Sequence, residues 1–218
     1  MDNKPLDLKV LIKAAYEKMN AEPSNSMRLI DFITNQNKVI LNREQRDKEE
    51  YPYIPLTSRF LVFIGYFIKE LNQFYKIPKD LRNKYQLFID LGAGNGATKI
   101  ISVFSNIFEY VGIEKYPIPN YDKQVIKKAD FLKIKPFNDI RKSYLPIIGK
   151  SNIIFYAYNP LCDPLAMYMA LMFWVDKVLV SGDVLIYART SNFTREQEKK
   201  FNSLFIPLTG RIYIYIKP

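Results

Sequence analysis

The feature that most constrains this chain is a glycine-rich segment, Phe88 to Gly96, which reads FIDLGAGNG. Three of the eight glycines of the chain fall within five residues there. The apolar start of the segment is typical of a buried strand, and Ala97 to Phe108 after it has the periodicity of an amphipathic helix. Glycines at such a turn let the backbone bend sharply and approach a ligand closely. Amides at the start of the following helix can bind an anionic group. The segment therefore predicts a ligand-binding strand-to-helix turn, and a turn without a ligand is the alternative.

Strand-like runs alternate with helical patterns from Gln86 onward. The predicted strands cover residues 86–91, 109–113, 125–129, 152–158 and 183–188, and the predicted helices cover residues 97–108 and 163–176. Two further runs, 204–208 and 211–217, are separated by Thr209 and Gly210, which predicts a hairpin. Alternating strands and helices favour a parallel sheet with helices on both faces. We therefore expect an α/β domain with a mostly parallel, seven-stranded sheet that ends in an antiparallel hairpin.

The first 80 residues have a different character. Helical patterns cover residues 4–21, a stretch from about residue 27, and residues 59–75, with Thr57 or Ser58 available as the cap of the third helix. We expect residues 1–80 to form a helical N-terminal extension packed on a domain of residues 81–218. Only about ten residues, two of them proline, separate Glu114 from Val125, whereas a parallel crossover normally needs a dozen or more. We expect that connection to contain little helix, so that the extension covers the sheet face it leaves open.

The amino acid composition limits the kinds of catalytic and metal site that the chain can form. The chain has no histidine and one cysteine, Cys162, which excludes histidine-dependent catalytic triads and makes a metal site unexpected. No apolar run approaches the ~18 residues that span a bilayer, and Met1 to Asp7 lack the pattern of a secretory signal. A cytoplasmic protein is therefore expected. The net charge of +10 favours an anionic partner, although scattered lysines leave a simple compositional bias equally open.

A dinucleotide site is one interpretation of the glycine-rich segment. Gly92, Gly94 and Ala97 fit the permissive G-x-G-x-x-G/A pattern, and Glu114 follows about 20 residues later. Asp90 argues against it, because a carboxylate at the end of the strand would repel a pyrophosphate and attract an ammonium group. A cofactor with an amino acid head suits this arrangement better.

The segment from Asp90 to Gly96 resembles the first motif of class I methyltransferases, and the resemblance extends over roughly residues 50–218. It implies a Rossmann-like fold and S-adenosyl-L-methionine as cofactor. The cofactor-binding residues that it implies are Asp90, Gly92, Ala93, Gly94, Asn95, Gly96, Glu114, Asp130 and Phe131. In that family the acid matching Asp90 lies near the methionyl amine, and the acid matching Glu114 binds the ribose hydroxyls. The resemblance likewise assigns Asp130 to the adenine amino group and Phe131 to stacking on the ring, with a turn-capping role as the alternative for Asp130.

The stretch Tyr158-Asn159-Pro160-Leu161 follows the fourth predicted strand. It resembles the Asn-Pro-Pro-aromatic motif of methyltransferases that act on adenine or glutamine nitrogens, but leucine and cysteine replace its last two residues. It is closer to a Tyr-Asn-Pro stretch in a less characterised branch of the same fold. The resemblance implies that Tyr158, Asn159 and Pro160 form the acceptor side of the site, with a turn ended by Pro160 as the alternative.

The sequence therefore predicts an S-adenosylmethionine-dependent methyltransferase with a macromolecular acceptor, either protein side chains or nucleic acid, and a small-molecule acceptor is the less favoured alternative. Two alternatives remain open. One is a non-catalytic nucleic-acid-binding module on the same fold, and the other is a NAD-dependent oxidoreductase.

Overall fold

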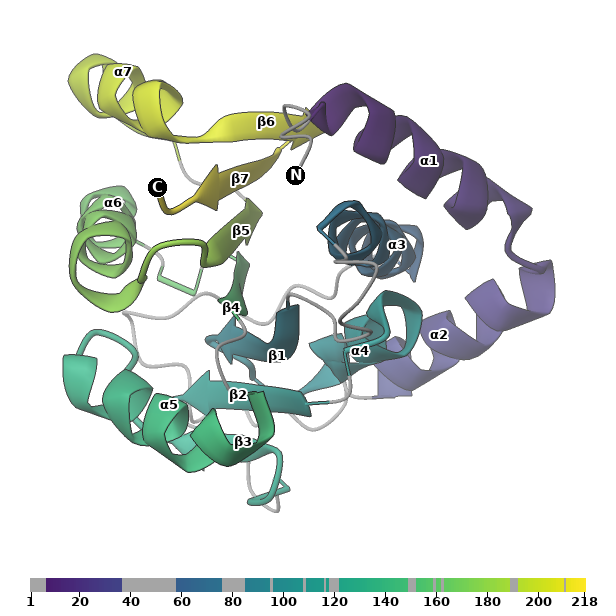
Figure 1. Ribbon diagram of the computed structural model, residues 1–218, viewed down its shortest axis with the longest axis horizontal. Helices are drawn as coiled ribbons and strands as arrows, with labels where there is room; N and C mark the ends of the chain where they lie inside the picture. The colour runs from purple at the N-terminus through teal and green to yellow at the C-terminus, as the bar shows by residue number, and fades with distance from the viewer. Residues whose placement is uncertain are drawn as a thin grey trace.

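A computed structural model of the protein describes residues 7–36, 58–75, 85–94, 96–107, 109–115, 117, 122–148, 152–158, 160–161, 163–188, 192–209 and 211–218. Its centre is a seven-stranded sheet with helices on both faces (Figure 1). The strands are β1 (Tyr85–Leu91), β2 (Glu109–Glu114), β3 (Ile126–Lys128), β4 (Asn152–Tyr158), β5 (Val184–Ala188), β6 (Ile206–Thr209) and β7 (Ile212–Ile216). This architecture confirms the expected α/β fold.

The strands lie in the order β3-β2-β1-β4-β5-β7-β6. Strands β1 to β5 are parallel, whereas β7 is antiparallel to both β5 and β6, which confirms the predicted hairpin. The chain reverses its direction of winding between β1 and β4, which are neighbours in the sheet. Ligands of open α/β sheets bind beyond the carboxyl ends of the strands at such a point. The topology therefore directs attention to the ends of β1, β2 and β4.

The helices form two layers. They are α1 (Leu8–Ala21), α2 (Ser24–Gln36), α3 (Ser58–Phe74), α4 (Ile100–Ser105), α5 (Ile134–Ile148), α6 (Pro164–Phe173) and α7 (Arg195–Leu204). Helices α1 to α4 lie on one side of the sheet, and α5 to α7 lie on the other (Figure 1). A 3-10 turn, Ala97–Lys99, precedes α4, and a π-helical turn, Trp174–Val178, follows α6. None of the helices in the described residues has both the length and the apolar character needed to cross a bilayer.

Strand β1 is buried on both faces, as its nearly continuous apolar sequence requires. Leu87, Ile89 and Leu91 belong to the core beneath α5, α6 and α7. Phe88, between them, belongs to the opposite core, which also contains the apolar side chains of α1 and α3. The N-terminal helices therefore cover one face of the sheet, as the sequence predicted, and α3 shares a single core with the strands.

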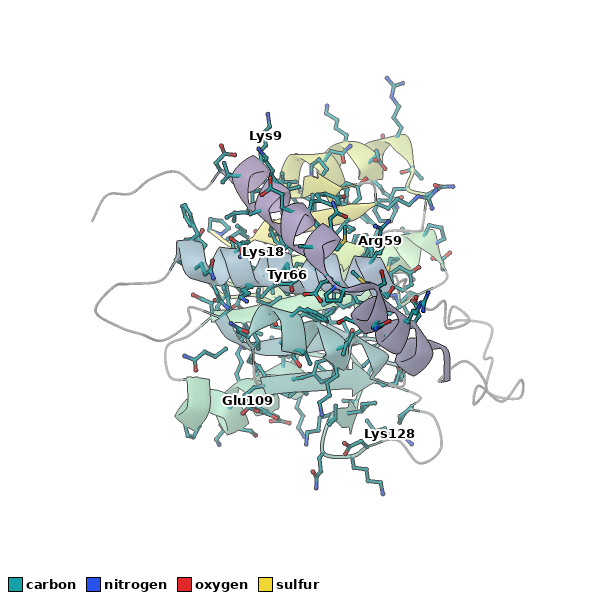
Figure 2. All side chains as sticks on the ribbon, turned by 90° about the vertical axis from the view of Figure 1, so that its right-hand side faces the viewer. Lys9, Lys18, Arg59, Tyr66, Glu109 and Lys128 are labelled. Carbon is teal, nitrogen blue, oxygen red and sulfur yellow. The ribbon has the colours of Figure 1, made fainter. Side chains whose placement is uncertain are left out.

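Polar contacts join α1 to α3. Lys18 forms an ion pair with Glu70, and the Tyr66 hydroxyl donates a hydrogen bond to Glu22 (Figure 2). Burial, followed by the hydrogen bond and charge of Glu22, raises the pKa of Tyr66 to about 12. These contacts supplement the apolar packing of α1 on α3. The division at residue 80 remains a prediction.

The connection from β2 to β3 is described at residues 115, 117 and 122–125, and none of these is helical. Helices α5 and α7 are not among the elements that the sequence patterns indicated. The described helix after β1 is also shorter than predicted, because α4 ends at Ser105 and Asn106 adopts a left-handed conformation with φ of 58°.

Candidate functional site

The glycine-rich turn between β1 and α4 is built on left-handed backbone. Gly92, Gly94 and Gly96 have φ values of +76°, +55° and +79°, in a region that other residues rarely adopt. A Cβ atom on Gly92 would lie 2.4 Å from the Cβ of Pro160. The first glycine is thus required both by its conformation and by the close approach of the segment that follows β4.

Strand β2 holds this turn in place. The backbone amides of Gly92 and Ala93 both donate to the carbonyl of Ile113, at 2.9 and 3.2 Å. The next residue, Glu114, ends β2 with 6% of its surface exposed, and its Oε2 accepts a 2.8 Å hydrogen bond from the amide of Gly94. The structure therefore brings Glu114 directly against the glycine turn.

Asp90 lies one strand away from Glu114 and is 2% exposed. Its Oδ2 accepts a 2.9 Å hydrogen bond from the hydroxyl of Tyr110 and a second hydrogen bond from the hydroxyl of Thr98. Burial raises the pKa of Asp90 to about 7, against the two hydrogen bonds, which lower it, and with a small further increase from the charge of Glu114. The carboxyl group therefore titrates near neutral pH.

The three oxygens around Asp90 form a closed group. The hydroxyls of Thr98 and Tyr110 are 2.9 Å apart, so each of the three lies within hydrogen-bonding distance of the other two. Each hydroxyl has one proton and donates it to Oδ2, so neither has a proton left for their mutual contact. These two donated hydrogen bonds favour the ionised carboxylate, and burial, which favours the neutral acid, outweighs them.

Asp130 lies at the same edge of the sheet. The amide of Ala129 donates to the carbonyl of Glu114 at 3.0 Å, which places the segment after β3 beside the end of β2. The Asp130 Oδ1 accepts a 2.9 Å hydrogen bond from the amide of Leu132, so this side chain caps its own turn. Asp130 therefore has the turn-capping contact of the alternative interpretation and a position next to Glu114.

Phe131 is buried beside Trp174, and its expected contact with the adenine ring remains a prediction. Its side chain is 2% exposed, its ring lies edge-on to that of Trp174 with the centroids 6.1 Å apart, and its carbonyl accepts a 2.8 Å hydrogen bond from the Trp174 indole. The ring is consequently part of the core beneath α5 and α6.

The acceptor-side stretch is described in part. Tyr158 ends β4 half-buried, with its ring 6.4 Å from that of Phe60 on α3, and Pro160 packs on Gly92. Burial raises the pKa of the Tyr158 hydroxyl, and the charge of Arg211 opposes this increase. Asn159, like Asn95 of the glycine turn, lies outside the described residues.

Three side chains near the site were not indicated by the sequence: Thr98, Tyr110 and Phe60. Tyr110 pairs with Phe88 in the register of β1 and β2, and their rings stack with the centroids 5.8 Å apart. Only this register places the Tyr110 hydroxyl beside Asp90. Thr98, eight residues after Asp90, is the one that a sequence signal could have found, since it lies in the first turn after the glycines.

The site is thus a left-handed glycine turn flanked by two carboxyl groups at the ends of adjacent strands. The described residues contain no group of three or more Cys, Asp or Glu side chains arranged to hold a metal ion. A site with this charge suits a ligand that carries positive groups.

No family model and no curated protein matches the sequence. Solved structures with a similar fold include a ribosomal RNA methyltransferase from Plasmodium falciparum, which is 17% identical over 70% of this chain and 94% of that chain, with a TM-score of 0.40. The plantazolicin methyltransferase BpumL, in complex with a pentazolic desmethylPZN analog and SAH, is 15% identical over 90% of this chain and 64% of its own, with a TM-score of 0.35. Its complex with a triazolic analog has 13% identity and a TM-score of 0.32. Likeness at this level concerns the fold alone.

Proposed function

We propose that this protein is an S-adenosylmethionine-dependent methyltransferase whose cofactor binds at the glycine turn between β1 and α4. The observation that carries the proposal is the position of Asp90 and Glu114, which lie at the carboxyl ends of the adjacent strands β1 and β2, next to a left-handed glycine turn. The sequence resemblance to the first motif of class I methyltransferases points to the same ligand.

The charge of the site separates the two cofactor classes. S-adenosylmethionine carries an ammonium group and a sulfonium, and both are attracted by carboxylates. A dinucleotide would bring a pyrophosphate to the same turn, where Asp90 and Glu114 would repel it. We therefore place NAD behind S-adenosylmethionine as a ligand.

Each acid has a distinct role in this proposal. Asp90 in its ionised form pairs with the methionyl ammonium group, directly or through water. Glu114 accepts hydrogen bonds from the ribose hydroxyls, because a carboxylate has acceptor capacity on both oxygens. Asp130 lies next to Glu114 and accepts a hydrogen bond from the adenine amino group. The left-handed glycines leave room for the cofactor to approach the backbone.

When bound, the cofactor supplies a methyl group on a positively charged sulfur, which is already activated for displacement. The task of the protein is therefore mainly to position the acceptor atom in line with the carbon–sulfur bond. Asn159 and backbone carbonyls of the stretch from Tyr158 to Pro160 orient an acceptor nitrogen by accepting its hydrogen bonds. An acceptor nitrogen held there would present its lone pair to the methyl carbon, and it would release one proton to solvent after transfer. We propose a macromolecular acceptor, protein or nucleic acid, and a cytoplasmic location.

Cofactor choice is tested by thermal shift and calorimetry on the whole chain, since a ligand that binds only the folded state raises the melting temperature. We expect S-adenosylhomocysteine to stabilise the protein and NAD to have no effect. Stabilisation by NAD alone would overturn the proposal.

Catalysis is tested by incubating the protein with tritiated S-adenosylmethionine and a cell lysate, and then digesting with nuclease or protease. The digestion that releases the label identifies the acceptor class. We expect Asn159→Ala to retain cofactor affinity and to lose transfer. Cofactor binding with no transfer to any acceptor would instead indicate a non-catalytic binding module.

A further inference from the structure

The N-terminal end of α3 lies beside the acceptor side of the site. Asn72, near the other end of α3, forms hydrogen bonds of 2.9 and 3.2 Å with the backbone of Tyr85, where β1 begins. The helix therefore runs from the carboxyl edge of the strands to their amino edge. At the carboxyl edge, the ring of Phe60 meets that of Tyr158 edge-on, at 6.4 Å and 60°. The first turn of α3 thus borders the end of β4.

Arg211 approaches the same place from the C-terminal hairpin. Tyr158 pairs with Ala188, and Ala188 pairs with Ile212, so Arg211 lies just beyond this row of the sheet. Its side chain is exposed, and its positive charge acts on the Tyr158 hydroxyl. A helix, a central strand and the hairpin therefore bring two half-buried aromatic rings and one cation together at the carboxyl edge.

We propose that Phe60, Tyr158 and Arg211 form the acceptor-binding surface and that the acceptor is a single-stranded nucleic acid. This inference rests on the proposed function and names the substrate class of the same site. Aromatic side chains provide stacking faces for unpaired bases, and an adjacent arginine contacts a phosphate. The packing of Pro160 on Gly92 places this surface next to the glycine turn, as transfer to a bound base requires.

Further exposed cations lie on neighbouring elements. Arg59 precedes Phe60 on α3, Lys127 and Lys128 lie on β3, and Lys133 and Lys135 lie at the start of α5. In Figure 2, Arg59 and Lys128 lie toward the same edge of the molecule, opposite Glu109, where β2 begins. A polyanion gains from these cations, whereas the neutral nitrogen of a protein side chain gains no comparable attraction. The charge therefore favours nucleic acid over a protein side chain.

Binding of a fluorescein-labelled single-stranded RNA to the whole chain tests the cation. We expect Arg211→Gln to weaken binding and to reduce the slope of log affinity against log salt by about 1, as loss of one phosphate contact requires. Lys9→Gln removes the same charge from an exposed position on α1 and should leave the slope unchanged.

The same assay tests stacking. Phe60→Leu keeps an apolar side chain but removes the ring, and we expect binding to weaken about tenfold, within the range for one base stacked on an aromatic side chain. Phe60→Tyr should restore most of the affinity. Phe74→Leu is the matched control, because Phe74 is an exposed phenylalanine at the opposite end of α3.

Three results would overturn the inference: wild-type binding by both Arg211→Gln and Phe60→Leu, equal losses in the two controls, or tighter binding of lysine- and glutamine-containing peptides than of RNA and single-stranded DNA. Calorimetry with S-adenosylhomocysteine separates this inference from the proposed function, because cofactor binding is measured without any acceptor. If cofactor affinity is intact and the Arg211 and Phe60 variants bind RNA as wild type does, only the acceptor surface is rejected. Absent cofactor affinity rejects the proposed function itself.

Discussion

The hydroxyl of Tyr110 lies 2.9 Å from the Oδ2 of Asp90 and donates a hydrogen bond to it inside the core between β1 and β2. This contact ties the protonation state of a buried acid to the packing of the sheet. Because Thr98 contacts the same oxygen, the carboxyl group is held by two hydroxyls from two different elements. The protonation state of Asp90 therefore depends on the packing of the sheet and affects the proposed cofactor site.

Cofactor affinity should depend on pH through Asp90. The pKa of its carboxyl group is about 7 without ligand, and the ammonium group of the cofactor pairs with the ionised form. Affinity should therefore rise by up to about tenfold per pH unit below 7 and level off above it. Calorimetry with S-adenosylhomocysteine between pH 5.5 and pH 8.5 measures this profile. In Asp90→Asn we expect weak binding and a flat profile, and an unchanged profile would remove Asp90 from the site.

Stability should also depend on pH through Asp90, with the opposite sign. The pKa rises from 3.8 to about 7 on folding, so between these values the folded state binds more protons than the unfolded state. The free energy of unfolding contributed by this group therefore falls as pH rises from about 4 to about 7. Urea denaturation at pH 5 and pH 8 measures this effect. The free energy of unfolding should fall less from pH 5 to pH 8 for Asp90→Asn than for wild type. Asp139→Asn, on the exposed face of α5, is the control, and its free energy of unfolding should fall between pH 5 and pH 8 by as much as that of wild type. An identical decrease in all three proteins would contradict the burial of a protonated Asp90.

Replacement of Tyr110 should shift the pH profile. The Tyr110 hydrogen bond lowers the pKa of Asp90, so Tyr110→Phe should move the midpoint of cofactor binding to higher pH. The phenyl ring keeps the stacking on Phe88, which limits any loss of packing. Tyr213→Phe, on β7, is the matched control. A midpoint that does not move would show that the hydroxyl does not act on Asp90 in solution.

The contact between Gly92 and Pro160 should appear as an energetic coupling. Gly92→Ala places a methyl group 2.4 Å from the Pro160 Cβ and forces an L residue to adopt φ of +76°, so we expect destabilisation of about 1–3 kcal/mol. Pro160→Gly removes the Cβ of residue 160, whereas Pro160→Ala keeps it. We therefore expect Pro160→Gly, combined with Gly92→Ala, to relieve the collision but not the backbone strain at residue 92. A double-mutant cycle by urea denaturation measures the difference. Strict additivity of the two changes would show that the segments do not touch.

Local sequence patterns located most of the elements. The strand pattern of residues 152–158 matches β4, and the helical pattern of residues 59–75 matches α3 within one residue at each end. Helix α7 was missed because most of its residues are charged or polar and Phe201 is its one buried residue, so the sequence offers few apolar positions from which to recognise it. Its signal was a capping box, in which Thr194 and Gln197 bond each other's backbone amides. Helix α5 contains Pro146 and begins next to exposed apolar residues, which obscured its buried face.

The sequence by itself determined the strand-to-helix turn, the alternation of strands and helices, and the acids at the strand ends, because these follow from local periodicity and backbone preferences. Only the tertiary structure decided what surrounds those acids. Tyr110 is 20 residues from Asp90 along the chain and reaches it through the register of two strands. Phe60, Tyr158 and Arg211 likewise meet only because a helix, a strand and a hairpin end at the same edge. Burial and charge at a site depend on residues that are distant in sequence, and no local pattern records them.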